Sequence, residues 1–506
     1  MAKITGRKTF RLNNLTGGIN SISEDNTLTS FSDQGGAAEA RDIENMLPLN
    51  RGGWSQTNGF SVFFSTGSAT KISGLYRFIK SDGTNLFLYS QGTLVKKLVA
   101  GVATSIGATI SSATYPHFET AMDKCVICDG VSAPVVYDGA TTATLTGTPP
   151  VGAPMSLFYQ NRLWLPKGSN VFYSNVQDIT TGYGSQFVAC NISDGQSIVG
   201  ITKFFIPGQL APIIFVQKTR SSGIITGDGS DASPYTYIQS NEDIGGSSFR
   251  GAIQSGQDIA YLTPRGVTSY KTDNSITNFI YNYLSEKVRD KFQALDPTYL
   301  KDSIAFYDWR RTRIGFAVPE FGKTTPNVIW FLDTRLGAWY KERWNTGQDC
   351  TSVLIDSDGL WYHGDSSGNI YLHDSGFRFN ETAIKFYYQT GYMDFGDPNL
   401  YKHIVQARMM VRGNGIYPIS ITNNQNYGIR TGRPTTLNLT GGQYKWGGGK
   451  WNNTGIYKWG KGAVSFPKFF PGGDFQTIQF KISGQDINND LSIFELEFIT
   501  QFTGLY

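Results

Sequence analysis

The pair Cys125 and Cys128 has the spacing of a redox motif or of half a zinc site. A redox pair needs its first cysteine at the start of a helix, and a zinc site needs a second matching pair. Residues 125–128 instead form an apolar run that leads into the Asp129-Gly130 turn, which predicts a strand. Four cysteines are also too few for a disulfide framework in a chain of 506 residues. We expect ordinary reduced thiols.

Two other groups could bind phosphate or a metal. Residues 455–461 fit the first seven positions of a P-loop, but the eighth is Gly462 and no strand-then-helix pattern surrounds them. His363 and His373 flank a predicted hairpin, with Asp365 beside one of them, so a metal site is conceivable there. Coincidence in a loop rich in glycine and lysine, and polar residues at a strand edge, explain these patterns more simply. We expect no catalytic residues, no metal and no cofactor.

A glycan hydrolase is the alternative class. Residues 356–361 faintly match the Asp-box hairpin of sialidases, with compressed spacing. Arg310, Arg311 and Arg313 crowd one turn, whereas a clamp on a substrate carboxylate would draw arginines from separate parts of the fold. The chain has many carboxylates, and the sequence does not show which of them approach within catalytic distance of each other.

The most unusual stretch is 429–473, a basic aromatic loop with seven lysines and arginines and no acidic residue. The tetrapeptide Tyr444-Lys445-Trp446-Gly447 is repeated from Tyr457 to Gly460. Lysines attract phosphate, and tryptophans stack on bases or pack on the apolar surface of a partner. The candidate contacts with DNA or with a partner protein are Lys445, Trp446, Lys450, Trp451, Lys458, Trp459 and Lys461.

The composition favours β-structure. The chain has 58 glycines and 14% aromatic residues, and only 17% of its residues are charged. Glycine punctuates turns and aromatic side chains pack on pleated surfaces. A net charge of +4 is too small for this length to argue for nucleic acid. The first residues lead into no apolar segment typical of a signal peptide, and no apolar run is long enough to span a membrane.

Short apolar runs recur through the middle of the chain. One of them, Asn161-Arg162-Leu163-Trp164, lies between two similar runs separated by polar turns, as in an antiparallel meander. The runs recur about every 45 residues, which is the length of a four-stranded propeller blade. Asp-Gly pairs at 82–83, 129–130, 138–139 and 358–359 predict hairpin turns between strands. We expect an all-β fold with a β-propeller of six to eight blades at 71–376.

The two ends differ from this pattern. Residues 1–70 are expected to form an N-terminal arm, with a short helix over 37–47, and a second helix is expected over 284–295. Residues 377–506 show longer alternating strands, which predict a C-terminal β-sandwich-like domain. Its strands place Val405, Ala407, Met409 and Val411 on one face.

Several motifs resemble the tail nozzle proteins of short-tailed bacteriophages, also called tail tubular or stabilisation proteins. In this family the element that ends here in Thr57-Asn58-Gly59-Phe60 usually reads Arg-Pro-Gly-Phe. The matching segments of this chain are Gly17-Gly18-Ile19-Asn20, Gly52-Gly53-Trp54, Asn161-Arg162-Leu163-Trp164 with Val171-Phe172-Tyr173-Ser174, Trp330-Phe331-Leu332-Asp333 with Gly337-Ala338-Trp339-Tyr340, 389–398, and Phe494-Glu495-Leu496-Glu497-Phe498.

The resemblance implies a structural virion protein rather than an enzyme. Such a protein would form a ring, expected to be a homo-hexamer, that extends the DNA ejection channel of the tail. Its expected partners are the portal or adaptor proteins, possible tail fibres, and phage DNA passing transiently through the lumen. Its expected location is the virion tail, after assembly in the host cytoplasm. In this setting we favour a subunit interface for the basic aromatic loop, because a conduit that gripped DNA would slow its passage. A propeller-based glycan hydrolase and a carbohydrate-binding tail protein remain the alternatives.

Overall fold

The computed structural model describes residues 6–28, 36–204, 213–256, 258–272, 279–345, 347–413, 417–439, 464–486 and 491–504. The chain forms two compact units. The propeller unit comprises Val62–Ile329 and Thr346–His373, and the terminal unit comprises Met1–Ser61, Trp330–Asn345 and Asp374–Tyr506. The expected divisions lay at 70/71 and 376/377. In the structure residues 1–61 belong to the same unit as the C-terminal strands and do not form a separate arm.

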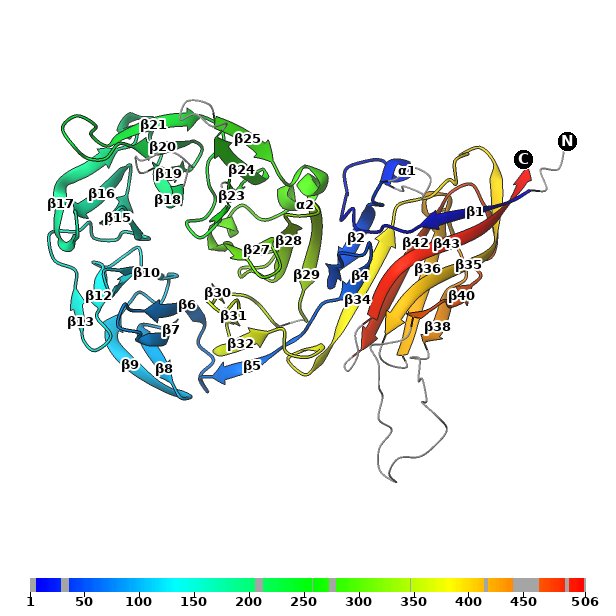
Figure 1. Ribbon diagram of the computed structural model, residues 1–506, viewed down its shortest axis with the longest axis horizontal. Helices are drawn as coiled ribbons and strands as arrows, with labels where there is room; N and C mark the ends of the chain where they lie inside the picture. Colours follow the sequence, from blue (N-terminus) through cyan, green and yellow to red (C-terminus); the bar gives the residue numbers. More distant parts are fainter. Residues whose placement is uncertain are drawn as a thin grey trace, which may run out of the picture. The chain divides into compact units, whose positions relative to one another are not determined.

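In the described part of the chain the propeller has seven four-stranded blades (Figure 1). Five of them are separate four-stranded antiparallel sheets, and the other two are parts of a 15-stranded sheet that also contains strands of the terminal unit. Each of the first five blades is one continuous stretch of sequence. Blade 1 is β6 (Ile72–Ile79), β7 (Asn85–Gln91), β8 (Leu94–Val99) and β9 (Val102–Thr109). Blade 2 is β10 (His117–Ala121), β11 (Lys124–Cys128), β12 (Val135–Tyr137) and β13 (Thr142–Thr144). Blade 3 is β14 (Leu157–Tyr159), β15 (Arg162–Lys167), β16 (Asn170–Asn175) and β17 (Asp178–Ala189).

Blade 4 is β18 (Ile198–Phe204), β19 (Ile213–Lys218), β20 (Ser222–Thr226) and β21 (Thr236–Asn241). Blade 5 is β22 (Ala252–Ser255), β23 (Asp258–Thr263), β24 (Gly266–Thr272) and β25 (Phe279–Tyr283). Blade 6 is β26 (Ile304–Asp308), β27 (Arg313–Val318), β28 (Val328–Asp333) and β29 (Ala338–Arg343), and the chain passes from one unit to the other within β28. Blade 7 is β30 (Ser352–Ile355), β31 (Trp361–Gly364), β32 (Asn369–His373) and β5 (Phe60–Ser65).

The seventh blade closes the ring, because β5 precedes the first blade in sequence while the other three strands follow the sixth. Near the join, Thr66 donates its backbone N–H to the Gly368 carbonyl at 3.1 Å, and the Ser65 hydroxyl donates to Asn369 at 2.8 Å. The shared blade joins the start and the end of the propeller sequence, while the outermost strand of each of the first five blades remains an edge strand.

The meander predicted around Asn161 is confirmed as β14, β15 and β16. Tyr159 pairs with Arg162, so Gln160 and Asn161 form a two-residue turn with φ of 55° and 57°. Positive φ at both central residues is the geometry that matches the twist of paired strands. In the Asp-Gly turns only the glycine has positive φ; Gly83, for example, has φ of 85°.

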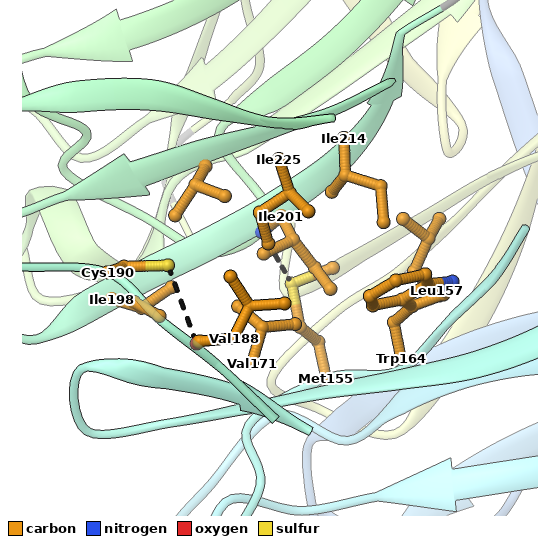
Figure 2. Packing of buried hydrophobic residues seen from close by; sticks show 11 residues of the cluster. Met155, Leu157, Trp164, Val171, Val188, Cys190, Ile198, Ile201, Ile214 and Ile225 are labelled. Atoms are coloured by element: carbon orange, nitrogen blue, oxygen red, sulfur yellow. Dashed lines mark hydrogen bonds between the residues drawn. The ribbon is translucent and has the colours of Figure 1, made fainter. Parts of the chain in front are cut away.

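Neighbouring blades pack through apolar clusters. Figure 2 shows the cluster between blades 3 and 4, where Trp164 is fully buried and donates its indole N–H to the Tyr159 carbonyl at 3.1 Å. The Trp164 ring contacts Tyr173 and Tyr235 at centroid distances of 5.1 and 4.9 Å. Burial of large side chains on both faces of each blade explains why the strands are apolar runs and do not alternate strictly.

The terminal unit contains an eight-stranded sheet and, besides the strands of blades 6 and 7, seven strands of the 15-stranded sheet, and in both of them strands from the two ends of the chain pair with one another. The first has the order β3 (Met46–Pro48), β4 (Trp54–Gln56), β43 (Leu491–Gly504), β35 (Tyr401–Gly413) and β39 (Val464–Ser465). In this sheet β1 (Arg7–Leu12) also pairs with β43, and β40 (Lys468–Phe469) and β41 (Asp474–Phe475) pair with β35. The second contains β2 (Ala40–Glu44), β33 (Arg378–Phe379), β34 (Thr382–Thr390), β42 (Ile478–Asp486), β36 (Tyr417–Gln425), β37 (Arg430–Thr431) and β38 (Thr435–Leu439).

The two sheets pack face to face as the expected sandwich. Phe480 of β42 stacks on Phe498 of β43 at 5.2 Å and makes an edge contact with Phe469 of β40 at 5.8 Å. One detail of the predicted alternation is wrong: Ile404 is buried and Val405 is only partly buried. A bulge between Ile404 and Gln406 shifts the register of β35. The side chains before the bulge therefore point to the opposite face of the sheet from the one that strict alternation predicts.

Helices are few and short among the described residues: α1 (Asp25–Leu28), α2 (Arg289–Gln293), η2 (Ile192–Asp194), η3 (Glu286–Val288), η4 (Leu300–Asp302) and η5 (Asn426–Gly428). The helix expected over 37–47 is wrong. Ala40 and Ile43 are buried in β2, which pairs with β34. Asn45, with φ of 57°, then bends the chain into β3, and its side-chain amide donates to the carbonyls of Arg343 and Lys385 at 2.9 and 2.7 Å. Strand pairing outweighs helix propensity here.

The helix expected over 284–295 is present in shorter form as η3 and α2, with Val288 and Phe292 buried. Ser285, the expected cap, makes no side-chain capping bond. Its hydroxyl accepts the backbone N–H of Val267 at 2.9 Å instead, which ties the helical segment to β24.

Candidate functional site

The candidate contacts predicted in the basic aromatic loop lie outside the described residues. These are Lys445, Trp446, Lys450, Trp451, Lys458, Trp459 and Lys461. The described chain ends at Leu439 of β38 on one side of them and resumes at Val464 of β39 on the other. Their role therefore stays a prediction.

The C-x-x-C pair lies in β11, as the sequence predicts, and its two thiols face different blades. Cys125 packs in the cluster that contains Phe78 and Tyr137, whereas Cys128 packs in the cluster that contains Leu163. Both thiols are free and buried, and burial raises the pKa of Cys128 to about 12. They are separate core residues, and neither is an activated nucleophile.

The histidines of blade 7 form a buried pair. His363 Nδ1 and His373 Nε2 are 2.7 Å apart, and the His373 ring stacks on Trp361. Burial lowers the pKa of both rings well below the ordinary value, so the pair is neutral and shares one hydrogen bond. Nearby, Asp365 accepts the Tyr371 hydroxyl and backbone N–H groups of its own hairpin. Across the described chain, no group of three His, Cys, Asp or Glu residues is placed to hold a metal ion.

The residues of the hydrolase alternative are occupied by local contacts. Arg313 is buried and pairs with Asp308 at 2.8 Å, while Arg311 reaches the same carboxylate at 3.5 Å. Asp356, from the Asp-box-like segment, accepts the Arg77 Nε at 2.9 Å. These charges fasten turns and neighbouring blades and do not converge on a common cleft.

A group of polar residues that the sequence analysis missed lies along the central cavity of the propeller. The innermost strands β6, β10, β14, β18, β22, β26 and β30 all contribute to its wall, and its volume is about 520 Å³. Most of the lining is apolar or small. The ionisable side chains among its lining residues are Tyr76, His117, Glu119, Lys203 and Arg250.

Glu119 and His117 project from the same face of β10 toward blade 3. Glu119 Oε1 accepts the Phe158 N–H at 3.1 Å, and His117 Nδ1 accepts the Ser156 N–H at 3.4 Å. Burial raises the pKa of Glu119 to about 7, against the Phe158 hydrogen bond and nearby Lys203, which lower it. Burial, assisted by Arg250, lowers the pKa of His117 to about 4. His117 is therefore neutral at pH 7, with its proton on Nε2.

Arg250 lies just before β22 and links three blades. Its Nη1 donates to the Thr351 carbonyl at 2.9 Å, and its Nη2 donates to the Asp302 carbonyl at 2.7 Å. The guanidinium lies over the Tyr115 ring at 4.0 Å from its centroid. Burial lowers the pKa of Arg250, although an arginine remains charged at any physiological pH.

No short sequence signal marks this group. Its members come from blades 1, 2, 4 and 5 and are joined only by their place on or beside an innermost strand. The one available signal is the blade period itself, because a polar residue near the first strand of each repeat must face the axis. Applying that signal requires the blade boundaries, which the sequence gives only approximately.

The geometry defines a seven-bladed β-propeller attached to a sandwich made from both chain ends. No family model and no curated protein matches the chain. Among solved structures, it is similar to the WD40 β-propeller domain of Doa1, at 8% identity over 62% of this chain and 97% of that one, with a TM-score of 0.40. YCF48 from Cyanidioschyzon merolae is similar at 10% identity over 61% and 96%, with a TM-score of 0.39.

The extracellular domain of a two-component system from B. thetaiotaomicron is also similar, at 10% identity and a TM-score of 0.43. That match covers 73% of this chain but only 44% of the other. All three scores are below 0.5, so the fold assignment rests on the sheet topology, and none of the three names mentions a virion or a tail. Within the described ranges, no helix is long and apolar enough to cross a bilayer.

Proposed function

We propose that this chain is a structural, ring-forming subunit of a short phage tail, a nozzle or hub that extends the DNA ejection channel. Its proposed partners are the portal or adaptor on one side and the tail tip or fibres on the other. One observation carries the proposal: motifs that resemble the nozzle family, although scattered along the sequence, contact one another inside the terminal unit.

The Gly-Gly-Ile-Asn motif packs directly on the Gly-Ala-Trp-Tyr motif, more than 300 residues later. Ile19 donates its backbone N–H to the Trp339 carbonyl at 2.7 Å. Gly18 has φ of 79°, and a Cβ at this position would meet Trp339 N at 2.7 Å and Ala338 Cα at 2.8 Å. Only glycine fits this backbone conformation and this close approach.

The Gly-Gly-Trp motif joins the same core. Trp54 is fully buried, donates its indole N–H to the Leu15 carbonyl at 2.6 Å, and contacts Tyr340 edge to face at 5.6 Å. A Cβ on Gly53 would meet the Ile493 carbonyl oxygen at 2.3 Å, beside Phe494 of the closing motif. These three motifs and the closing motif thus share one packing arrangement in the terminal unit, as a common fold with the nozzle family would require. The motif pair at 161–164 and 171–174 lies apart from them, in blade 3 of the propeller unit.

The propeller unit supplies a rigid body, and the residues that suggested a hydrolase are used there as structural ion pairs. This use of the residues supports a structural role over the glycan hydrolase. It points to no residue that would bind carbohydrate. Fold alone would not support any of the three.

The test is the assembly state of the purified full-length chain, by native mass measurement and negative-stain imaging over a range of concentrations. The proposal expects closed rings, because a heterologous contact whose rotation closes forms a ring and not a filament. The resemblance to the nozzle family implies six subunits in each ring. A chain that remains monomeric at every concentration, with or without the adaptor, would overturn it. Turnover of host-wall glycans that Glu119→Gln abolishes would favour the hydrolase instead.

A further inference from the structure

The central cavity has the size of a small-molecule site. Its volume of about 520 Å³ lies within the range of roughly 300–1,000 Å³ that is typical of ligand pockets. Its walls come from all seven blades, so they are fixed by the closed ring and do not depend on one loop. Aromatic and aliphatic side chains form much of the wall, and a few polar groups converge on it, which is the usual composition of such a site.

Arg250 has hydrogen-bonding capacity that the protein leaves unused. Two of its five N–H donors reach backbone carbonyls, but its Nε is buried and has no partner among the described residues. No carboxylate of those residues forms an ion pair with it. The Asp302 carboxylate acts on Arg250 electrostatically without forming a direct ion pair. A planar guanidinium is shaped to bind carboxylate or phosphate through two parallel hydrogen bonds.

The charge around Arg250 favours an anion. Lys71 Nζ lies 4.1 Å from the centroid of the Tyr115 ring that Arg250 also covers, so two cations share one aromatic ring. Lys203 lines the same cavity. Two acids oppose them, Glu119 and Asp302, but Asp302 offers Arg250 its backbone carbonyl and not its carboxylate.

We propose that the central cavity of the propeller binds a small molecule through a carboxylate or phosphate group held by Arg250. Lys71 adds long-range attraction, and the apolar inner strands accommodate the remainder of the ligand. This site is independent of the ring assembly proposed above, because every residue named for it lies in the propeller unit.

The experiment measures binding to the full-length chain by calorimetry and by the shift in thermal unfolding, with inorganic phosphate and succinate as separate probes. Sodium chloride at equal ionic strength serves as the reference. A ligand that binds only the folded state raises the unfolding midpoint in proportion to the logarithm of its concentration. The proposal expects saturable binding of at least one probe, and the stronger probe identifies the anionic group.

Three variants assign the binding to the cavity. Arg250→Lys keeps the charge but loses the fork of donors, and should weaken binding at least tenfold. Lys71→Gln leaves Arg250 in place and should weaken binding severalfold. Arg310→Gln is the matched control, because Arg310 is an exposed arginine of the same unit. Lys71→Gln remains informative if Arg250→Lys fails to fold.

No saturable binding of either probe to the unmodified chain would overturn the proposal. Equal binding by the unmodified chain and by every folded variant at positions 250 and 71 would also overturn it, because the anions would then act on the general surface. Weaker binding by Arg250→Lys and by Lys71→Gln, with no change in Arg310→Gln, would establish it.

Discussion

The propeller unit and the terminal unit are both β-structures, but their strands are brought together differently. Each of the first five blades consists of strands consecutive in sequence and joined by hairpins. In the terminal unit, β43 pairs with β1 and β4 from the opposite end of the chain. Local pairing leaves a periodic signal in the sequence, whereas pairing between the two chain ends leaves none. The strand pairing of the propeller unit is therefore predictable from the sequence, whereas the pairing between the two chain ends in the terminal unit is not.

If the propeller depends on packing between blades, a large deletion in one blade interface should cost the most. Trp164→Ala removes a fully buried ring between blades 3 and 4 and should lower the free energy of unfolding by about 3–5 kcal/mol. Chemical denaturation with tryptophan fluorescence and circular dichroism would measure this loss. Trp309→Ala is the control, because that ring is 48% exposed, and it should cost far less. Equal losses would mean that the blade interface is not the main source of stability.

If the terminal unit depends on the joining of distant motifs, a methyl group at their contact should disrupt it. Gly18→Ala places a Cβ against the backbone of Trp339 at positive φ, and should cost about 2–4 kcal/mol from strain and overpacking together. The matched control is Gly396→Ala in the same unit. Gly396 has φ of 85° but nothing within 4 Å of the added methyl, so it should cost only about 1 kcal/mol.

Two unfolding transitions would show which unit is affected. Gly18→Ala should lower the transition of the terminal unit more than that of the propeller unit, because Trp339 belongs to the terminal unit although its strand β29 is also part of blade 6. A loss no larger than that of Gly396→Ala would contradict the close approach.

The sequence predicted what depends on neighbours in the chain. The run around Asn161 was predicted as a meander because its turn and its apolar strands lie within about 20 residues, and the structure confirms it. The helix expected over 37–47 was wrong because the partner of β2 is β34, more than 300 residues away. The bulge at Val405 and the position of β5 in blade 7 also depend on distant partners.

The candidate site shows the same limit. The sequence analysis selected clusters of neighbouring residues, such as Cys125 with Cys128, and the structure separates these two between blade interfaces. The cavity residues Glu119 and Arg250 are single polar residues in unremarkable stretches. They meet only because the ring brings the first strand of every blade to the axis.

The central cavity also gives a pH test with two opposing contributions to stability. Glu119 has a folded pKa of about 7 against an ordinary 4.5, so the folded protein keeps a proton that the unfolded chain releases. Stability from this group falls as pH rises from 4.5 to 7. His117 has a pKa of about 4 in the folded protein, against an ordinary value of 6.5. Between these two pH values the unfolded chain therefore binds a proton that the folded protein does not bind. Stability from this group falls as pH falls from 6.5 to 4.

The two slopes nearly cancel between pH 4.5 and 6.5 in the unmodified chain, and single variants should expose them. Glu119→Gln keeps an acceptor for the Phe158 N–H, and should leave stability that declines toward low pH. His117→Asn should leave stability that declines toward neutral pH. Denaturation at a series of pH values, in buffers without phosphate or carboxylate, measures both. Parallel pH profiles for the two variants would contradict the burial of these groups.

The smallest effect on stability, and the sharpest on function, is expected in the basic aromatic loop, which belongs to the terminal unit. Replacement of four lysines of the loop by Gln should leave both unfolding transitions unchanged. The four are Lys445, Lys450, Lys458 and Lys461. Under the interface hypothesis ring formation is also unchanged by these substitutions, whereas Trp446→Ala with Trp459→Ala should break rings or tail attachment. Under the DNA hypothesis the unmodified chain binds DNA with a steep dependence on salt, and the four lysine changes flatten that dependence because fewer counterions are released. Normal assembly by the double tryptophan variant, together with no DNA binding by the unmodified chain, would contradict both hypotheses.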